Sequence, residues 1–336
     1  MNDELRRLLA EAGVAGEFDW RDIVVRHNNA PVPQLVPATA TEPWHRGFNL
    51  VVLSRGVPTF FCKCRPGGDP VLARETHLRT YLAGARCGGL RVPPARVASS
   101  SRIAVQVSPF LRGVHYGRIV TRQSPGAYVK TLRGILEGAA ELWNIAQLGS
   151  GGGVRSPSAS IVLQAAARES LADLATLESF EPELLAALGA AVREAGEVPS
   201  LPQHGDFWWQ NVLMAEGHYW AIDFDAFGEV HVPLYDDLTM MCSTLVLRPG
   251  AGNTGFERLL TDTVEARGCR VVLAEHASSS GLTPSQLDGV LAYQLVHMAS
   301  SVKRRGGPVH AAPHLAAVRR AARLLASGER GLLSVR

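Results

Sequence analysis

The sequence predicts an α+β fold with two lobes: a small antiparallel β-sheet lobe with one helix, and a larger, mainly helical lobe. Three observations carry this prediction. Short apolar runs separated by turn residues crowd positions 44–110. Helical periodicity dominates from about residue 114 onwards. A strand–turn–strand pattern over residues 212–223 then places a hairpin inside the helical part.

The expected division follows from these patterns. Residues 1–43 are expected as an N-terminal extension, 44–110 as the first lobe, 106–113 as a hinge and 114–336 as the second lobe.

Composition indicates a globular protein with a sizeable core. The chain has 336 residues, of which 46% are hydrophobic and 19% are charged, and its formal charge is +3. That charge is too small to indicate a nucleic-acid partner. No apolar run reaches the ~20 residues of a membrane span, and the acidic start of the chain lacks the apolar core of a secretion signal. The sequence therefore predicts a cytoplasmic protein that binds neither nucleic acid nor membrane.

The cysteines are odd in number and scattered, which predicts a reducing compartment without a disulfide framework. They are Cys62, Cys64, Cys87, Cys242 and Cys269. The first two alternate within a strand pattern and are expected to pack on one side rather than to bind a metal.

Periodicity and turn residues predict the elements of the first 113 residues. The expected elements are a helix at 3–12, a proline-rich extended connection at 30–41, strands at 48–53 and 58–64, a helix at 71–82, and strands at 90–92 and 101–107.

Lys63 stands in the otherwise apolar strand 58–64. An ammonium on a buried strand needs a partner, because an unpaired buried charge costs several kcal/mol. The following helix offers Glu75. The alternative is an ordinary surface lysine and a solvated glutamate.

The second lobe is expected to contain helices at 125–148, 160–177, 181–195, 255–266, 283–302 and 310–327. The glycine run Gly149–Gly153 has neither a Gly-Lys-Ser/Thr ending nor a preceding strand, so it predicts a linker rather than a phosphate cradle.

A compact polar set lies between the helices of this lobe. Residues 204–211 read His-Gly-Asp-Phe-Trp-Trp-Gln-Asn, and Asp223 follows twelve residues later in Ala-Ile-Asp-Phe-Asp. One carboxylate can accept a proton from a hydroxyl while an amide and a second carboxylate hold a divalent cation on nucleotide phosphates. Oxygen ligands of this kind suit Mg²⁺, and zinc is not expected because neither His nor Cys has ligand spacing here. The alternative is a polar loop that contains these letters by chance.

The pattern HGDxxxxN followed by IDFD resembles the aminoglycoside phosphotransferase and choline kinase family, which has a protein-kinase-like fold. The resemblance implies that Asp206 is the catalytic base and that Asn211 and Asp223 bind Mg²⁺. It also implies that Lys63 contacts nucleotide phosphates and that Glu75 orients it. ATP is the expected nucleotide, and GTP is not excluded.

The resemblance implies weaker assignments as well. Gly47 and Asn49 loosely match the phosphate-covering loop, although a Gly-x-Asn segment also occurs in ordinary turns. Backbone groups of residues 106–110, among them Gln106 and Ser108, would pair with the adenine edge.

Further residues are expected to support the loop or the acceptor. His204 and Asp225 are expected in supporting positions. Residues 233–238 are expected to open a helix, with one acid of the segment as its N-cap, and the resemblance implies that Asp237 braces the catalytic loop. Trp208 and Trp209 form either an acceptor wall or part of the aromatic core.

Residues 301–336 are basic, which bears on the acceptor. They hold Lys303, Arg304, Arg305, Arg319, Arg320, Arg323, Arg330 and Arg336 against the single acid Glu329. A polycationic aminoglycoside needs acidic partners, so this region favours a neutral or anionic hydroxyl compound. The alternative is a solvated arginine face that points away from the acceptor.

The sequence thus predicts an ATP- and Mg²⁺-dependent phosphotransferase that acts on a small-molecule hydroxyl, with an antibiotic or related natural product as the expected acceptor. The alternatives are a small-metabolite kinase of the choline, homoserine or sugar type and a kinase-fold nucleotide-binding protein without transfer activity. A protein kinase is disfavoured, because Gly205 replaces the arginine of that class and no Ala-Pro-Glu segment follows Asp223.

Overall fold

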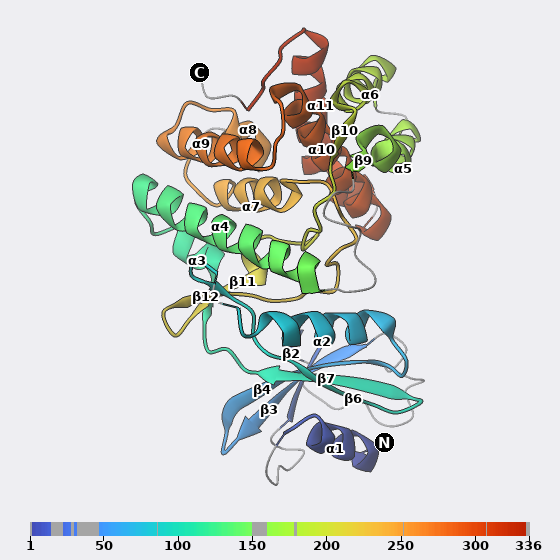
Figure 1. Cartoon of the computed structure of the whole chain (residues 1–336), viewed down its shortest axis with the longest axis vertical. Helices are drawn as coiled ribbons and strands as arrows, with labels where there is room; N and C mark the ends of the chain where they lie inside the picture. The colour runs from blue at the N-terminus through green and yellow to red at the C-terminus, as the bar shows by residue number, and fades with distance from the viewer. Residues whose placement is uncertain are drawn as a thin grey trace. The chain divides into compact units, whose positions relative to one another are not determined.

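The computed structural model divides the chain into two compact units (Figure 1). The first unit comprises Met1–Arg86, Leu90–Gly113 and Leu213–Asp225, and the second comprises Cys87–Gly89, Val114–Val212 and Ala226–Arg336. The structure describes residues 2–14, 23–27, 30–31, 47–85, 87–149, 160–177, 180–250, 252–306 and 308–333.

A six-stranded antiparallel sheet forms the centre of the first unit, in the order β2-β1-β3-β4-β7-β6. Its strands are β1 (Ile23–His27), β2 (Ala30–Pro31), β3 (Phe48–Ser54), β4 (Val57–Pro66), β6 (Arg96–Ser99) and β7 (Ile103–Pro109). Arg55 and Gly56 connect β3 to β4 with φ values of 51° and 77°, as tight hairpin turns require. Elsewhere in this unit, β12 (His218–Ala221) pairs in parallel with β5 (Leu90–Arg91) and lies beside β11 (Val212–Ala215).

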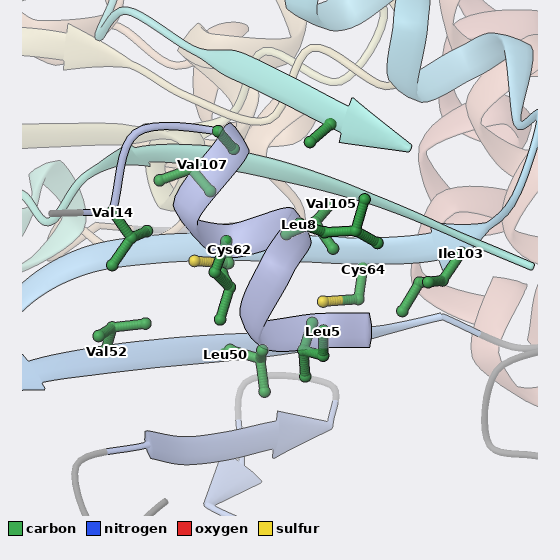
Figure 2. Close-up of a cluster of buried hydrophobic side chains, with 13 residues drawn as sticks. Leu5, Leu8, Val14, Leu50, Val52, Cys62, Cys64, Ile103, Val105 and Val107 are labelled. Atoms are coloured by element: carbon green, nitrogen blue, oxygen red, sulfur yellow. The ribbon is translucent and has the colours of Figure 1, made fainter. Parts of the chain in front are cut away.

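The N-terminal segment belongs to this unit, so the prediction that residues 1–43 form an extension is wrong. Strand β1 pairs with β3, and helix α1 (Asn2–Glu11) packs its leucines onto the sheet. Figure 2 shows the resulting cluster, in which Leu5 and Leu8 face side chains of β3, β4 and β7. The loops around β1 and most of the proline-rich connection lie outside the described residues.

Strand alternation divides the side chains of β4 between two layers. Cys62 and Cys64 are fully buried in the cluster beneath α1, as their spacing predicts. Lys63 between them points to the opposite face, which helix α2 (Pro70–Leu82) covers (Figure 1). Asp69 caps α2 by accepting from the amides of Val71 and Leu72, so a local sequence signal fixes where this helix begins.

The second unit is mainly helical. Its helices are α3 (Tyr116–Val120), α4 (Pro125–Gly149), α5 (Leu163–Ala175), α6 (Pro182–Ala195), α7 (Tyr235–Leu245), α8 (Gly255–Leu259), α9 (Val264–Ser279), α10 (Pro284–Gly306) and α11 (Pro308–Ala326). Short strands β8 (Val114–His115), β9 (Ser160–Val162) and β10 (Glu197–Pro199) and a 3₁₀ turn (Trp209–Asn211) complete it. Helix α10 packs against α5, α6 and α11.

Two helix predictions need correction. The helix expected at 255–266 ends at Leu259, and α9 begins anew at Val264, where the Thr263 hydroxyl caps it. Residues 160–162 form a strand that pairs with β10 rather than the first turn of α5.

All five cysteines are free thiols, as expected. Among the described residues, no helix has both the length and the apolar character that crossing a bilayer requires. The glycine run at 150–153 lies outside the described residues.

Leu8→Ala tests whether α1 is part of the folded core. Leu8 is fully buried, and removing such a side chain typically lowers the free energy of unfolding by ~2–5 kcal/mol. The control is Arg7→Ala on the same helix, whose exposed pair with Glu11 contributes less than about 1 kcal/mol. Urea unfolding monitored by fluorescence measures both variants. Equal stability of Leu8→Ala and the wild type would show that α1 is dispensable.

Candidate active site

Lys63 is the centre of a buried ionic cluster in the first unit. Its Nζ lies 2.9 Å from Glu75 Oε2, 2.6 Å from Asp223 Oδ1 and 2.9 Å from Asp225 Oδ1. The lysine is only 5% exposed and Glu75 only 1%. Strand β4, the following helix α2 and the chain after β12, which lies far away in sequence, therefore converge on one ammonium group.

The charges in this cluster stabilise one another. Burial by itself lowers the pKa of Lys63, but Glu75, Asp223 and Asp225 together raise it above its ordinary value. Burial raises the pKa of Asp225, but the Lys63 ammonium, a hydrogen bond with Glu75 and the nearby Arg65 together outweigh burial and hold that pKa well below its usual range. The ammonium is thus protonated whenever the carboxylates are charged.

The backbone around Asp223 has an uncommon conformation that serves this cluster. Asp223 has a φ of 65°, in the left-handed region that few non-glycine residues adopt. The next amide, of Phe224, points towards Glu75 Oε1 at 3.4 Å. Strain of this kind is often found at functional sites, where surrounding contacts hold it in place.

Two arginines that the sequence reasoning did not consider also reach Asp225. The Arg65 Nη2 lies 3.5 Å from its Oδ2, and the Arg74 Nη2 donates to its backbone carbonyl at 3.0 Å. Arg65 follows Lys63 by two positions on β4, so strand alternation alone indicates that both face the same side.

The acidic members of the cluster fit a divalent cation. Oxygen atoms of Glu75, Asp223 and Asp225 lie within 4.8 Å of one another. Mg²⁺ prefers oxygen ligands such as carboxylates. An ionised carboxylate carries no proton, so its oxygen lone pairs can bind a cation.

The residues expected in the phosphate-covering loop lie beside this cluster. Asn49 stands directly opposite Lys63 in the β3–β4 pairing. Gly47 has a φ of 68°, and a Cβ there would lie 2.8 Å from the Arg65 side chain and 3.0 Å from the Cys64 carbonyl oxygen, so this position favours glycine. Residues 44–46 of the expected loop lie outside the described residues.

The assignment of Gln106 and Ser108 to the adenine edge is not supported. The amide of Phe110 donates to Thr59 O of β4, and the backbone groups of alternate residues in a strand point to the same side. The backbone groups of Gln106 and Ser108 therefore face β4, where they pair with Lys63 and Phe61. The Gln106 side chain is 1% exposed and bonds to α2.

The catalytic-loop sequence forms a tight structure in the second unit. The Asn211 Nδ2 donates to the backbone carbonyl of Asp206 at 2.8 Å and to its Oδ2 at 3.1 Å. The amide of Asn211 donates to Trp208 O and closes the 3₁₀ turn. Asn211 therefore orients the Asp206 carboxylate, and the two residues of the motif act together.

Glycine at 205 is a steric requirement of this loop. Gly205 has a φ of 81°, and a Cβ there would lie 2.8 Å from the carbonyl oxygen of Ala226. An arginine, as protein kinases have, would not fit this backbone. The His204 ring is fully buried against Trp143 and Phe207, so this residue anchors the loop in the aromatic core.

The residue that braces the loop is Asp236, and the prediction that Asp237 does so is wrong. Asp236 accepts from the amides of His204 at 2.6 Å and Gly205 at 3.1 Å. Asp237 instead pairs with His276 of α9 and helps to raise the pKa of that imidazole against the effect of burial. Two adjacent acids at a helix start cannot be told apart without knowing which side of the helix is buried.

The two tryptophans of the loop lie together, with ring centroids 5.7 Å apart. Trp209 packs so closely on α3 that a side chain at Gly117 would overlap its ring. Trp209 therefore packs structurally, whereas Trp208 remains a proposal for the acceptor wall.

The basic C-terminal residues are largely paired, which removes the argument for a neutral or anionic acceptor. Their partners lie on or beside α5 and α6. The bonds are Lys303 to Asp173 O, Arg304 to Glu169 and Asp173, Arg319 and Arg323 to Glu181, and Arg330 to Glu194. These side chains hold helices together, as the alternative interpretation of a non-functional arginine face anticipates. The side chains of Arg305 and Arg336 lie outside the described residues.

Comparison with known proteins finds similarity in structure alone. No protein-family model and no curated protein sequence matches the chain. The macrolide 2'-phosphotransferase MphH from Brachybacterium faecium matches with a TM-score of 0.56 at 16% identity, over 94% of this chain and 98% of that chain. A thermostable mutant of aminoglycoside phosphotransferase APH(4)-Ia, solved with AMP-PNP and hygromycin B, matches with a TM-score of 0.54 at 13% identity, over 82% and 90%. Glucosamine kinase in complex with glucosamine, ADP and inorganic phosphate matches with a TM-score of 0.50 at 15% identity, over 81% of this chain and 78% of that chain.

These matches confirm the predicted fold class. The chain has the kinase-like α+β fold of antibiotic phosphotransferases and of a sugar kinase.

Asp236 generates a prediction for the pH dependence of stability. Burial raises the pKa of this carboxyl to about 7, above its value in the unfolded chain, despite the two amides that favour the charged form. The folded state then binds the proton more tightly, so the carboxyl stabilises the fold most at acidic pH and progressively less as the pH rises towards 7.

Asp236→Asn removes that titration. The stability advantage of the wild type over Asp236→Asn should therefore shrink between pH 4.5 and 7.5, as measured by urea unfolding at both values. An advantage that grows over this range would show that the two amides, rather than burial, control the carboxyl.

Proposed function

We propose that this protein is a magnesium-dependent phosphotransferase that moves the terminal phosphoryl group of ATP to a hydroxyl group of a small molecule. The observation that carries the proposal is the buried Lys63–Glu75 pair with Asp223 in contact with the same ammonium. Two further observations support the proposal. The fold is shared with phosphotransferases, and the two polar residues of the HGDxxxxN motif, Asp206 and Asn211, are hydrogen-bonded to each other.

Lys63 is the proposed ligand of the nucleotide phosphates. An ammonium that several carboxylates surround is already desolvated and oriented, so exchanging a carboxylate for a phosphate oxygen needs little rearrangement. Glu75, which is buried and stays in place, keeps the lysine on this side of β4.

Asp206 is the proposed base. It accepts the proton of the acceptor hydroxyl while the hydroxyl oxygen forms a bond to the terminal phosphorus and the bond from that phosphorus to the leaving ADP oxygen breaks. Asn211 donates to one carboxylate oxygen of Asp206 at 3.1 Å and so fixes the orientation of the proposed base.

Asn211 and Asp223 are the proposed Mg²⁺ ligands, and Asp225 has donor atoms of the same kind. When bound with the nucleotide, the ion neutralises charge that develops on the phosphoryl oxygens.

The proposed acceptor is an antibiotic or related natural product with a free hydroxyl, and sugars and amino alcohols are the second class. Because the basic residues of the C-terminal helices are paired, charge gives no preference between these classes. An ADP-release screen should therefore include aminoglycosides, macrolides, amino sugars, choline-like alcohols and nucleosides, with product mass and NMR to locate the modified oxygen.

Asp206→Asn tests the base. It keeps the shape of the side chain and removes its basicity, so phosphoryl transfer should fall by about 10²–10⁴-fold while nucleotide affinity stays close to that of the wild type. Steady-state ADP release and calorimetric titration with AMP-PNP measure the two effects. Asp262→Asn, on an exposed side chain, is the matched control and should leave both unchanged. Full turnover in Asp206→Asn would rule out this residue as the base.

Lys63→Met tests the phosphate ligand. Loss of a charge-assisted contact to phosphate should weaken Mg·AMP-PNP binding by at least about tenfold, again by calorimetry. The sequence contains three lysines, and Lys130→Met on the exposed face of α4 is the matched control. Unaltered nucleotide affinity in Lys63→Met would refute the proposed binding mode.

A further inference from the structure

A buried arginine stands behind the Lys63–Glu75 pair. Arg79 is one turn after Glu75 on α2 and is only 3% exposed. Its Nη1 donates to Glu75 Oε1 at 3.3 Å and to Gln106 Oε1 at 2.9 Å, and its Nε donates to Pro93 O at 3.2 Å. The guanidinium therefore joins α2 to two other segments of the first unit.

Gln106 extends this connection. Its Nε2 donates to Thr76 Oγ1 at 2.8 Å, while its Oε1 accepts from Arg79. Both ends of one amide on β7 are thus bonded to α2, and Gln106 also lies directly opposite Lys63 in the β4–β7 pairing. A displacement of α2 along the sheet would break several buried hydrogen bonds at once.

Charge gives a second reason for the arginine. Three carboxylates, those of Glu75, Asp223 and Asp225, surround one ammonium, and Glu75 is the most buried of them. Arg79 supplies a second buried cation to Glu75: its Nη1 lies 3.3 Å from Oε1, which Lys63 also contacts at 3.1 Å. Without it Glu75 would have to share its only cation with two competing acids, and a less strongly held carboxylate orients the lysine less well.

A hydrophobic residue would serve equally well if the position only had to be filled. Burying an ion pair contributes little net stability, and apolar replacements are often neutral or stabilising. The fork of three directed N–H donors, each with an acceptor, is what an apolar side chain lacks and what lysine reproduces only in part.

We propose that Arg79 is a positioning residue: with Gln106 and the Pro93 carbonyl it fixes α2 on the sheet and holds Glu75 against Lys63, so that the phosphate-binding ammonium is oriented before nucleotide arrives. This inference rests on the proposed role of Lys63 in nucleotide binding. It adds a residue that touches neither nucleotide nor acceptor and acts through Glu75.

The test compares Arg79→Met, Arg79→Lys and Gln106→Met with two buried side chains of the second unit. Arg248 is 7% exposed and donates to Val120 O, Gln123 O and Glu265, so Arg248→Met removes a comparable set of bonds. Gln294→Met, at a residue 2% exposed, is the control for Gln106→Met.

Two measurements report on positioning rather than on stability. The first is the dissociation constant for Mg·AMP-PNP by calorimetry. The second needs no nucleotide: it is the rate at which Lys63 reacts with an acetylating reagent, relative to the exposed Lys130 of the same molecule, by peptide mass spectrometry. Urea unfolding of every variant reports stability separately.

We expect Arg79→Met to weaken Mg·AMP-PNP binding by about tenfold and to raise the relative acetylation of Lys63 by a similar factor, the usual effect of losing a hydrogen bond to a charged group. Arg79→Lys should recover part of both, and Gln106→Met should change both in the same direction by less. Arg248→Met and Gln294→Met should lower stability without either change.

Distinct outcomes separate this inference from the proposed function. Arg79→Met could lose as much stability as Arg248→Met and still keep wild-type affinity for Mg·AMP-PNP and wild-type acetylation of Lys63. That result would overturn the positioning role and leave the proposed function intact. If Arg79→Met does not fold, wild-type values in both Arg79→Lys and Gln106→Met would overturn it equally. Absence of nucleotide binding in the wild type would refute the proposed function itself, and this inference with it.

Discussion

The placement of one ammonium group on the inner face of a strand constrains the rest of the first unit. Strand alternation sends Cys62 and Cys64 into the core beneath α1, so Lys63 must point the other way, where only carboxylates make its burial tolerable. Helix α2 therefore docks with Glu75 inward. After β12 the chain turns at Asp223, whose own φ is left-handed, and the Asp223 carboxylate reaches the same nitrogen. A single buried charge thus fixes the positions of three separate segments.

In the second unit the loop over residues 204–211 is held by a buried acidic side chain, whereas the first unit uses a buried ammonium. There a buried carboxylate, Asp236, accepts from two successive backbone amides, and an aromatic cluster around His204 fills the space behind them. Gly205 lets the backbone approach Ala226 at a distance that no side chain would permit. Both units hold their polar groups in place through buried contacts within the protein. That arrangement suits the phosphoryl transfer proposed above, a reaction whose catalysis depends mainly on positioning and on stabilising charge.

The sequence predicts those features that depend on spacing and fails where a choice depends on packing. Alternation along 58–64 places Lys63 apart from its two cysteine neighbours, and the interval from Asp206 to Asn211 identifies a pair that proves to be hydrogen-bonded. Asp236 and Asp237 are adjacent acids at one helix start, and only the packing of α7 decides which faces the loop.

Strand β1 is not predicted, because its pairing partner β3 lies more than twenty residues away along the chain. The role of Arg79 is not predicted either, because its partners, Pro93 and Gln106, belong to other elements.

The pairing of the C-terminal arginines shows why the charge of a lobe is a poor guide to the charge of its acceptor. Eight basic residues within 301–336 suggest an anion-binding surface, yet four of them pair with acids that lie more than a hundred residues earlier in the chain, on or beside α5 and α6. Interactions between exposed charges are largely screened beyond ~8 Å in physiological salt, so only groups close to the acceptor select it. Solved structures that share this fold bind hygromycin B in one case and glucosamine in another. The same fold thus accommodates chemically different molecules, so an acceptor of this chain must be identified from its own side chains and by experiment.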